Sequence, residues 1–201
     1  MGPLFDILIA LVMLMLVLAL AQDRVWRVIA CILLIPAATL SIGGHLLDSS
    51  AQVTSVSVGH AIGALFFVAA AGRIIQTIMV SREITLDSIF GAICGYLLLG
   101  IACALTYAMI HAANPESFQL GDSVRPQMEQ GNHSRSIFIY YSFVTLTTVG
   151  YGDVTPISTP ARTLSWVEAM TGQLYLAVLI AGLISALVTS HSARIRGAGD
   201  H

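Results

Sequence analysis

The sequence predicts an all-α integral membrane protein with five transmembrane helices and one shorter apolar segment that enters and leaves the membrane on the same side. Of its 201 residues, 56% are hydrophobic and 10% are charged, whereas about a quarter of the residues in soluble domains are charged. A helix that crosses a bilayer needs about 20 mostly apolar residues. Five segments of suitable length contain no Asp, Glu, Lys or Arg, namely residues 7–22, 28–47, 52–72, 88–115 and 169–193. This pattern excludes a soluble enzyme, a nucleic-acid-binding protein and a disordered chain.

The first three helices form an N-terminal membrane region, residues 1–82. The first apolar run follows an acidic residue, Asp6, rather than the basic start of a signal peptide, so we expect it to remain as a membrane helix. The role of this region is open, because a degenerate voltage sensor, a belt around an oligomer and a surface for a partner all fit. The three helices are expected at residues 3–21, 28–44 and 56–80.

The second region, residues 83–193, combines two membrane helices with a long connection that is not uniform. Its middle part is apolar and aromatic but too short to cross a bilayer, which suggests a re-entrant helix. The expected parts are an outer helix at 88–113, an outer loop at 114–135, a re-entrant helix at 136–147, a glycine-containing segment at 148–153 and an inner helix at 164–190, followed by a tail at 194–201.

The arginines set the expected orientation, since the chain has nine of them and no lysine. Short cytoplasmic loops are enriched in basic residues. With the N-terminus outside and the C-terminus in the cytoplasm, only the long connection carries arginines on the outer side. We therefore expect a multi-pass protein of the cell membrane, plasma or inner. The arginines expected inside are Arg24, Arg27, Arg82, Arg194 and Arg196, and those expected outside are Arg125, Arg135 and Arg162.

The return of the re-entrant segment reads Thr147-Thr-Val-Gly-Tyr-Gly-Asp153. Non-helical backbone at membrane depth is tolerated where it lines a hydrated cavity. Glycines that alternate with larger residues allow successive peptides to alternate in hand, so that consecutive carbonyls can face one axis. Such a column of carbonyls replaces the water shell of a dehydrated potassium ion. The expected ligands are the carbonyls of Thr148, Val149, Gly150 and Tyr151 and the Thr148 hydroxyl, with Gly152 completing the segment.

The run from Thr148 to Asp153 resembles the selectivity filter of potassium channels. Residues 140–147 resemble their pore helix, residues 155–160 resemble their outer-mouth turn, and residues 86–190 are similar to small bacterial channels of the two-transmembrane-helix pore (ion channel) family. The resemblance implies a homotetramer, because four filter strands surround the axis in such channels. It also implies potassium-selective conduction, with K⁺ ions in the filter, no organic cofactor and no catalytic residues.

Other functions stay open beside this interpretation. A weakly selective cation channel is a close alternative, and a non-conducting membrane scaffold or regulatory subunit is a more distant one. The expected partners are membrane lipid and further copies of the chain, with no nucleic acid and with an unknown regulatory partner left open. The gating stimulus is open, although strong voltage gating is not expected, because Arg73 and Arg82 do not form a repeated series along one helix.

Several residues are candidates for supporting the filter. Thr147 precedes it, and Asp153 closes it at the outer mouth, where we expect a hydrogen bond to Tyr141 or simply a solvated carboxylate. Some channels of the resembling family have a glutamate where this chain has Val144, so filter stability would depend more on aromatic packing here. Glu168 lies inside the expected inner helix, where it would either brace the filter from behind or reach the outer interface.

Glycines and histidines complete the set of candidates. Gly172 lies at the position of a hinge glycine in the resembling channels, and Gly182 is a second gating-hinge candidate; close packing is the alternative for Gly172. The pairs Gly59/Gly63 and Gly91/Gly95 have the spacing of helix-contact surfaces. His60 and His111 are expected near outer helix ends in a solvated or interfacial setting, with no metal-ligand spacing and with external pH sensitivity left open.

Overall fold

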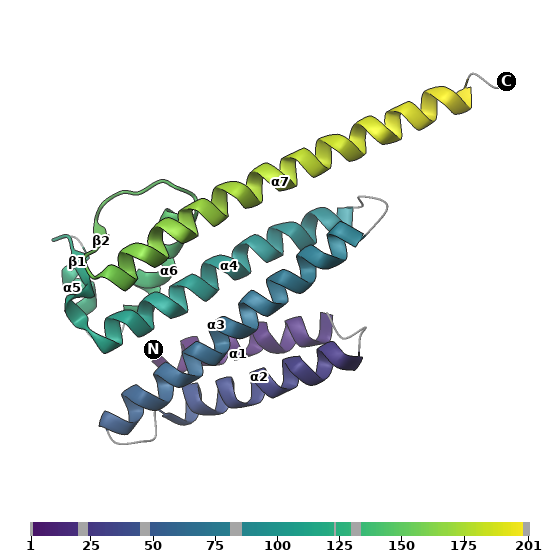
Figure 1. The fold of residues 1–201 in the computed structure, drawn as a ribbon. Coiled ribbons are helices and arrows are strands. Elements are labelled where there is room, and N and C mark those ends of the chain that lie inside the picture. The colour runs from purple at the N-terminus through teal and green to yellow at the C-terminus, as the bar shows by residue number, and fades with distance from the viewer. Residues whose placement is uncertain are drawn as a thin grey trace.

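A computed structural model of the chain is mostly helical (Figure 1) and describes residues 2–19, 24–44, 49–80, 86–122, 124–129 and 134–198. The long helices are α1 (Gly2–Ala19), α2 (Arg24–Gly43), α3 (Ser49–Val80), α4 (Leu86–Ala113) and α7 (Thr159–Ala198). The connection between α4 and α7 contains η2 (Pro115–Ser117), β1 (Phe118–Leu120), α5 (Arg125–Glu129), α6 (Ser134–Leu146) and β2 (Val154–Pro156).

Four helices are long and apolar enough to cross a membrane within the described residues: Trp26–Gly43, Ala51–Ile78, Asp87–Ala113 and Thr159–Gly182. The described part of α1 offers a shorter apolar stretch, Asp6–Ala19. The structure is mostly helical with four candidate membrane helices, which is consistent with the predicted all-α membrane protein, while the fifth crossing stays a prediction.

Several helices extend beyond their expected limits: α2 begins at Arg24 instead of residue 28, and α3 and α7 extend furthest. The chain enters α3 at Ser49, inside the expected polar loop, and the Ser55 hydroxyl donates a hydrogen bond to the carbonyl of Leu40 on α2 (3.0 Å). Contact with α2 thus extends the helix over polar residues. α7 begins at Thr159 instead of residue 164, with Pro160 in its first turn, where a missing N–H costs nothing. It continues to Ala198 through most of the expected tail, of which residues 199–201 lie outside the described residues.

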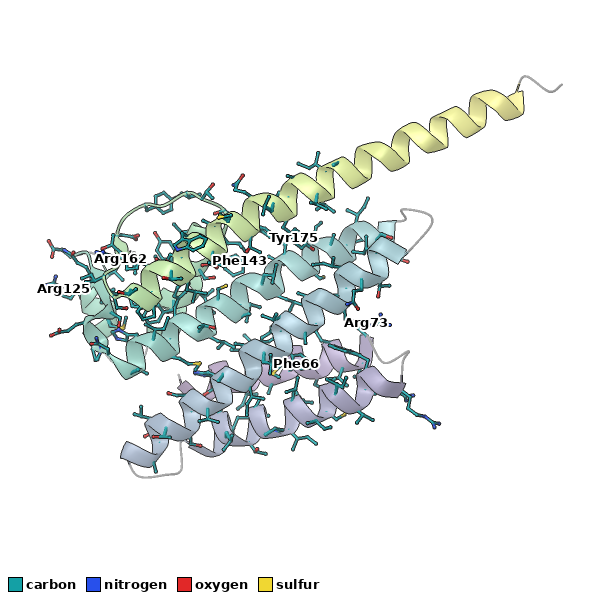
Figure 2. The ribbon with its side chains drawn as sticks, viewed as in Figure 1. Phe66, Arg73, Arg125, Phe143, Arg162 and Tyr175 are labelled. Atoms are coloured by element: carbon teal, nitrogen blue, oxygen red, sulfur yellow. The ribbon has the colours of Figure 1, made fainter. Side chains whose placement is uncertain are left out.

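The helices form two groups, one of α1, α2 and α3 and the other of α4, α6 and α7, and the groups meet where α3 packs against α4 (Figure 1). α3 packs against α2 and α4, while α4 packs against α6 and α7. The start of α1 and both strands lie at one end of the bundle, and α7 ends at the other. Arg125 and Arg162 lie at the end with the strands, whereas Arg73 lies toward the opposite end of α3 (Figure 2). The expected orientation of the termini in a membrane stays a prediction.

Two buried clusters hold these groups together. The first centres on Phe66 and Phe67, whose rings meet edge to face at 5.7 Å, and it joins the first four helices. The second surrounds Tyr107, Phe118 and Tyr141 near the strands and joins α4, α6 and β1. Edge-to-face aromatic pairs contribute about 0.5–1.5 kcal/mol each beyond the burial of their area. The second cluster therefore fixes α6 against α4 at the end of the bundle that carries the strands.

Glycines bring the helices close together, as their spacing predicts. A Cβ atom on Gly59 would overlap the Ser41 hydroxyl of α2, and one on Gly95 would lie 2.8 Å from the Tyr175 hydroxyl of α7. Tyr175 uses this approach to donate a hydrogen bond to the carbonyl of Ala92 on α4. Both glycines are thus contact positions between helices.

The structure buries His60, contrary to the expected interfacial setting. Its Nε2 atom lies 3.3 Å from Oδ1 of Asp6, and the two residues are 6% and 2% exposed. The pair connects α1 to α3 across 54 positions of the chain, which is why no local pattern reveals it. His111 is half-buried beside the ring of Phe138, at a centroid distance of 5.3 Å.

Candidate functional site: the segment between α6 and α7

The glycine-containing segment begins as the C-terminal cap of α6. The N–H of Thr148 donates to the carbonyl of Thr145, and the N–H of Val149 donates to that of Val144, both at 2.9 Å. Thr148 is left-handed, with φ 59°. A left-handed residue with these two hydrogen bonds is the Schellman motif, in which glycine is usual. A β-branched residue is rare in this conformation, and such strain persists where the surrounding structure enforces it.

The left-handed conformation then recurs at every second residue. Gly150 and Gly152 have φ values of 59° and 79°, so the backbone alternates in hand from residue 148 to residue 152. Within the part of the chain that the structure describes, no backbone N–H donates to the carbonyls of Thr148, Val149, Gly150 or Tyr151. The alternation agrees with the backbone geometry that the two glycines predict. It leaves a run of exposed carbonyls that can bind a cation or water.

A small antiparallel sheet holds the C-terminal end of this segment. β1 pairs with β2 so that Phe118 lies opposite Pro156 and Leu120 opposite Val154. Directly beside the sheet, the N–H of Gly121 donates to the carbonyl of Asp153 (2.8 Å). Sequence reasoning treated residues 114–135 as a polar loop, because strands of three residues are too short to show an alternating pattern.

The partner of Asp153 is Tyr140, which corrects the expected contact with Tyr141. The Tyr140 hydroxyl donates to Oδ2 of Asp153 (2.7 Å), and its ring lies parallel to that of Tyr151 at 6.4 Å. This hydrogen bond is the main reason why the pKa of Tyr140 is raised to about 12, so the phenol keeps the proton that it donates. Neighbouring residues on a helix point about 100° apart, and only one of the two tyrosines can face the segment.

Tyr141 instead faces the buried side of α6. Its hydroxyl lies 2.7 Å from that of Ser165 on α7, and its ring meets that of Tyr107 edge to face. Thr147, another expected support residue, turns back on its own helix and donates to the carbonyl of Phe143 (2.6 Å). Both residues thus stabilise the end of α6 rather than contact Asp153.

Glu168 is buried behind the segment and does not reach the outer interface. Its side chain is 2% exposed. Oε2 accepts a hydrogen bond from the Tyr107 hydroxyl (2.6 Å), and Oε1 accepts one from the Ser142 hydroxyl. Ser142 also lies 2.7 Å from the carbonyl of Gly100. The carboxylate therefore joins α4, α6 and α7 at the level of the second aromatic cluster.

Gly172 is a position of close packing. A Cβ atom there would overlap the carbonyl oxygen of Leu146, the last residue of α6. That carbonyl also accepts a hydrogen bond from the Tyr96 hydroxyl of α4 (3.2 Å). α7 runs without a break through Gly172 and Gly182, and among the described residues no atom outside the backbone of α7 lies within 4 Å of a Cβ built on Gly182. The contacts favour the packing alternative for Gly172, and the hinge role of both glycines stays a prediction.

Sequence reasoning missed Gln173. Its Nε2 atom donates a hydrogen bond to the hydroxyl oxygen of Thr148 (3.0 Å) at the start of the segment. No motif marks this residue, because the contact depends on how α7 is rotated against the end of α6. Phe143 and Tyr175 lie in the same region, where α4, α6 and α7 meet (Figure 2).

The comparison with protein families gives one match at this site. Residues 96–189 match the model of the ion channel family. The match supports an ion channel of the two-transmembrane-helix type. The matched residues contain most of α4, all of α6, the segment from Thr147 to Asp153 and most of α7. Searches of curated proteins and of solved structures gave no match.

Proposed function

We propose that the protein is a potassium-selective channel of the cell membrane, formed by four copies of the chain around one axis. The alternating backbone from Thr148 to Gly152, with its exposed carbonyls, carries the proposal, and the ion channel match supports it. Rings of carbonyl oxygens replace the hydration shell of potassium. One segment per chain supplies a quarter of each ring, so a closed ring requires a symmetric homotetramer.

The apolar surface that α7 exposes in the single chain supports the assembly of several chains. Only 11% of its membrane stretch is buried within the chain, against 44% for α3. Large apolar side chains on α7 are more than half exposed, namely Trp166, Met170, Leu174, Val178 and Ile180. Apolar surface of this extent marks a contact with protein or lipid. An inner helix that meets neighbouring subunits and lipid has this distribution, and we place the α7 C-terminus in the cytoplasm on the basis of the arginines.

Ion flux through purified protein in liposomes tests the proposal. We expect uptake of K⁺ down its gradient, little uptake of Na⁺, and block by Ba²⁺. Gly150→Ala is the matched inactive variant, because a side chain is strained at φ 59°. Equal K⁺ and Na⁺ uptake would indicate a weakly selective cation channel, and no uptake of either ion would indicate a scaffold or regulatory subunit.

Replacing Tyr140 with phenylalanine should destabilise the outer mouth. The variant loses the hydrogen bond to Asp153, and bonds to charged groups contribute about 1.5–3 kcal/mol. In bilayer recordings we expect the potassium current to decline about tenfold faster during sustained opening. Tyr141→Phe is the matched control, because that hydroxyl contacts Ser165 instead. Equal rates of decline in the two variants would remove Tyr140 from filter support.

A further inference from the structure

A glutamine amide lies at the inner end of the proposed filter. Gln173 follows Gly172, and the missing Cβ of that glycine lets α7 approach the end of α6. At this approach Nε2 of Gln173 reaches the Thr148 hydroxyl oxygen at 3.0 Å. The amide thus comes from the helix that would line the inner pore, while the hydroxyl belongs to the first residue of the alternating segment.

Thr148 is the residue whose orientation needs such support. It is exposed in the single chain, β-branched and left-handed, and its hydroxyl is the innermost expected ligand. A hydroxyl oxygen has two lone pairs. Accepting the amide N–H uses one lone pair and restricts rotation of the side chain, which leaves the second lone pair for a cation. The amide oxygen of Gln173 adds a second acceptor on the same exposed side chain.

We propose that Gln173 is a positioning residue for the Thr148 hydroxyl and sets the affinity of the inner end of the filter for a dehydrated cation. The inference rests on the proposed potassium channel. In the tetramer, four amides would orient four hydroxyls in one ring. A cation that enters from the cytoplasm then meets hydroxyl oxygens that are already oriented, and preorganised ligands bind more tightly than mobile ones.

Block by Ba²⁺ from the cytoplasmic side tests this role. Gln173→Leu removes the donor, and Gln173→Asn keeps the amide but shortens the side chain by one methylene. We expect both variants to bind internal Ba²⁺ about three- to tenfold more weakly, the range that corresponds to one net hydrogen bond. Thr171→Val is the matched control, because its hydroxyl donates within α7 to the carbonyl of Val167. That variant should be blocked like the unchanged protein.

A double-mutant cycle separates positioning from a general effect on packing. In a Thr148→Ala background there is no hydroxyl to orient, so Gln173→Leu should cause no further loss of Ba²⁺ affinity. Full additivity of the two changes would overturn the inference, as would Gln173 variants with unchanged internal block. In either case selective K⁺ flux through the unchanged protein would leave the proposed function intact. An unchanged protein that carries no K⁺ flux would overturn both.

Discussion

Replacing Gly172 with alanine should strongly reduce the assembly of a conducting channel. The added methyl group would overlap the Leu146 carbonyl oxygen and lie 3.1 Å from the carbonyl carbon. Backbone atoms cannot rotate away as a side chain can, so α7 must shift relative to α6. Overfilling a packed interface costs about 1–3 kcal/mol. The shift would also separate Gln173 from Thr148. We expect less tetramer on size-exclusion chromatography and more than tenfold less K⁺ flux.

Gly182→Ala is the matched control on the same helix. Apart from the backbone of α7 itself, no atom of the described residues lies within 4 Å of a Cβ at this position, and alanine favours a helix over glycine by about 1 kcal/mol. The variant should therefore assemble normally. If Gly182 is a gating hinge, the open probability should fall while the amount of tetramer stays the same. A Gly172→Ala protein that assembles and conducts like the unchanged protein would refute the packing interpretation.

The sequence predicts the parts of this fold that depend on local composition. Apolar runs without charge locate the helices, and the alternation of glycines from Thr148 to Gly152 predicts a backbone of alternating hand, which the structure has. The ion channel match covers the same region. Both signals lie within short stretches of the chain, so they are readable without knowledge of tertiary contacts.

Features that depend on contacts between distant segments could not be predicted. Whether Tyr140 or Tyr141 contacts Asp153 depends on the rotation of α6 about its own axis, because successive residues on a helix point about 100° apart. The buried pair of Asp6 and His60 requires the docking of α1 on α3. β1 and β2 have three residues each, too few for any periodicity to emerge.

Replacing Glu168 with glutamine should change channel gating while leaving the fold intact. Ser142 and Tyr107 both donate hydrogen bonds to the carboxylate, whereas an amide offers one acceptor oxygen and one donor group. One of the two hydroxyls must therefore reverse its hydrogen bond. Ser142 can do so by turning its proton to the carbonyl of Gly100, 2.7 Å away, whereas Tyr107 would have to turn to the Ser165 hydroxyl at 3.4 Å. The bonds to the neutral amide are weaker than those to the carboxylate. We expect a looser contact between α6 and α7 and an altered open probability in single-channel recordings.

Glu168→Leu should have the larger effect, because both hydroxyls then lose this acceptor. Ser142 keeps the carbonyl of Gly100 as an acceptor, whereas Tyr107 keeps only the Ser165 hydroxyl at 3.4 Å. A buried polar group left without a close partner costs about 1–3 kcal/mol. We expect lower thermal stability of the tetramer, measured by size-exclusion chromatography after heating, together with reduced K⁺ flux. Thr171→Val on the same helix leaves the network untouched and should retain both properties. Single-channel records of Glu168→Gln that match those of the unchanged protein would limit Glu168 to stability, because reversing one hydrogen bond behind the filter would then leave the open state unaffected.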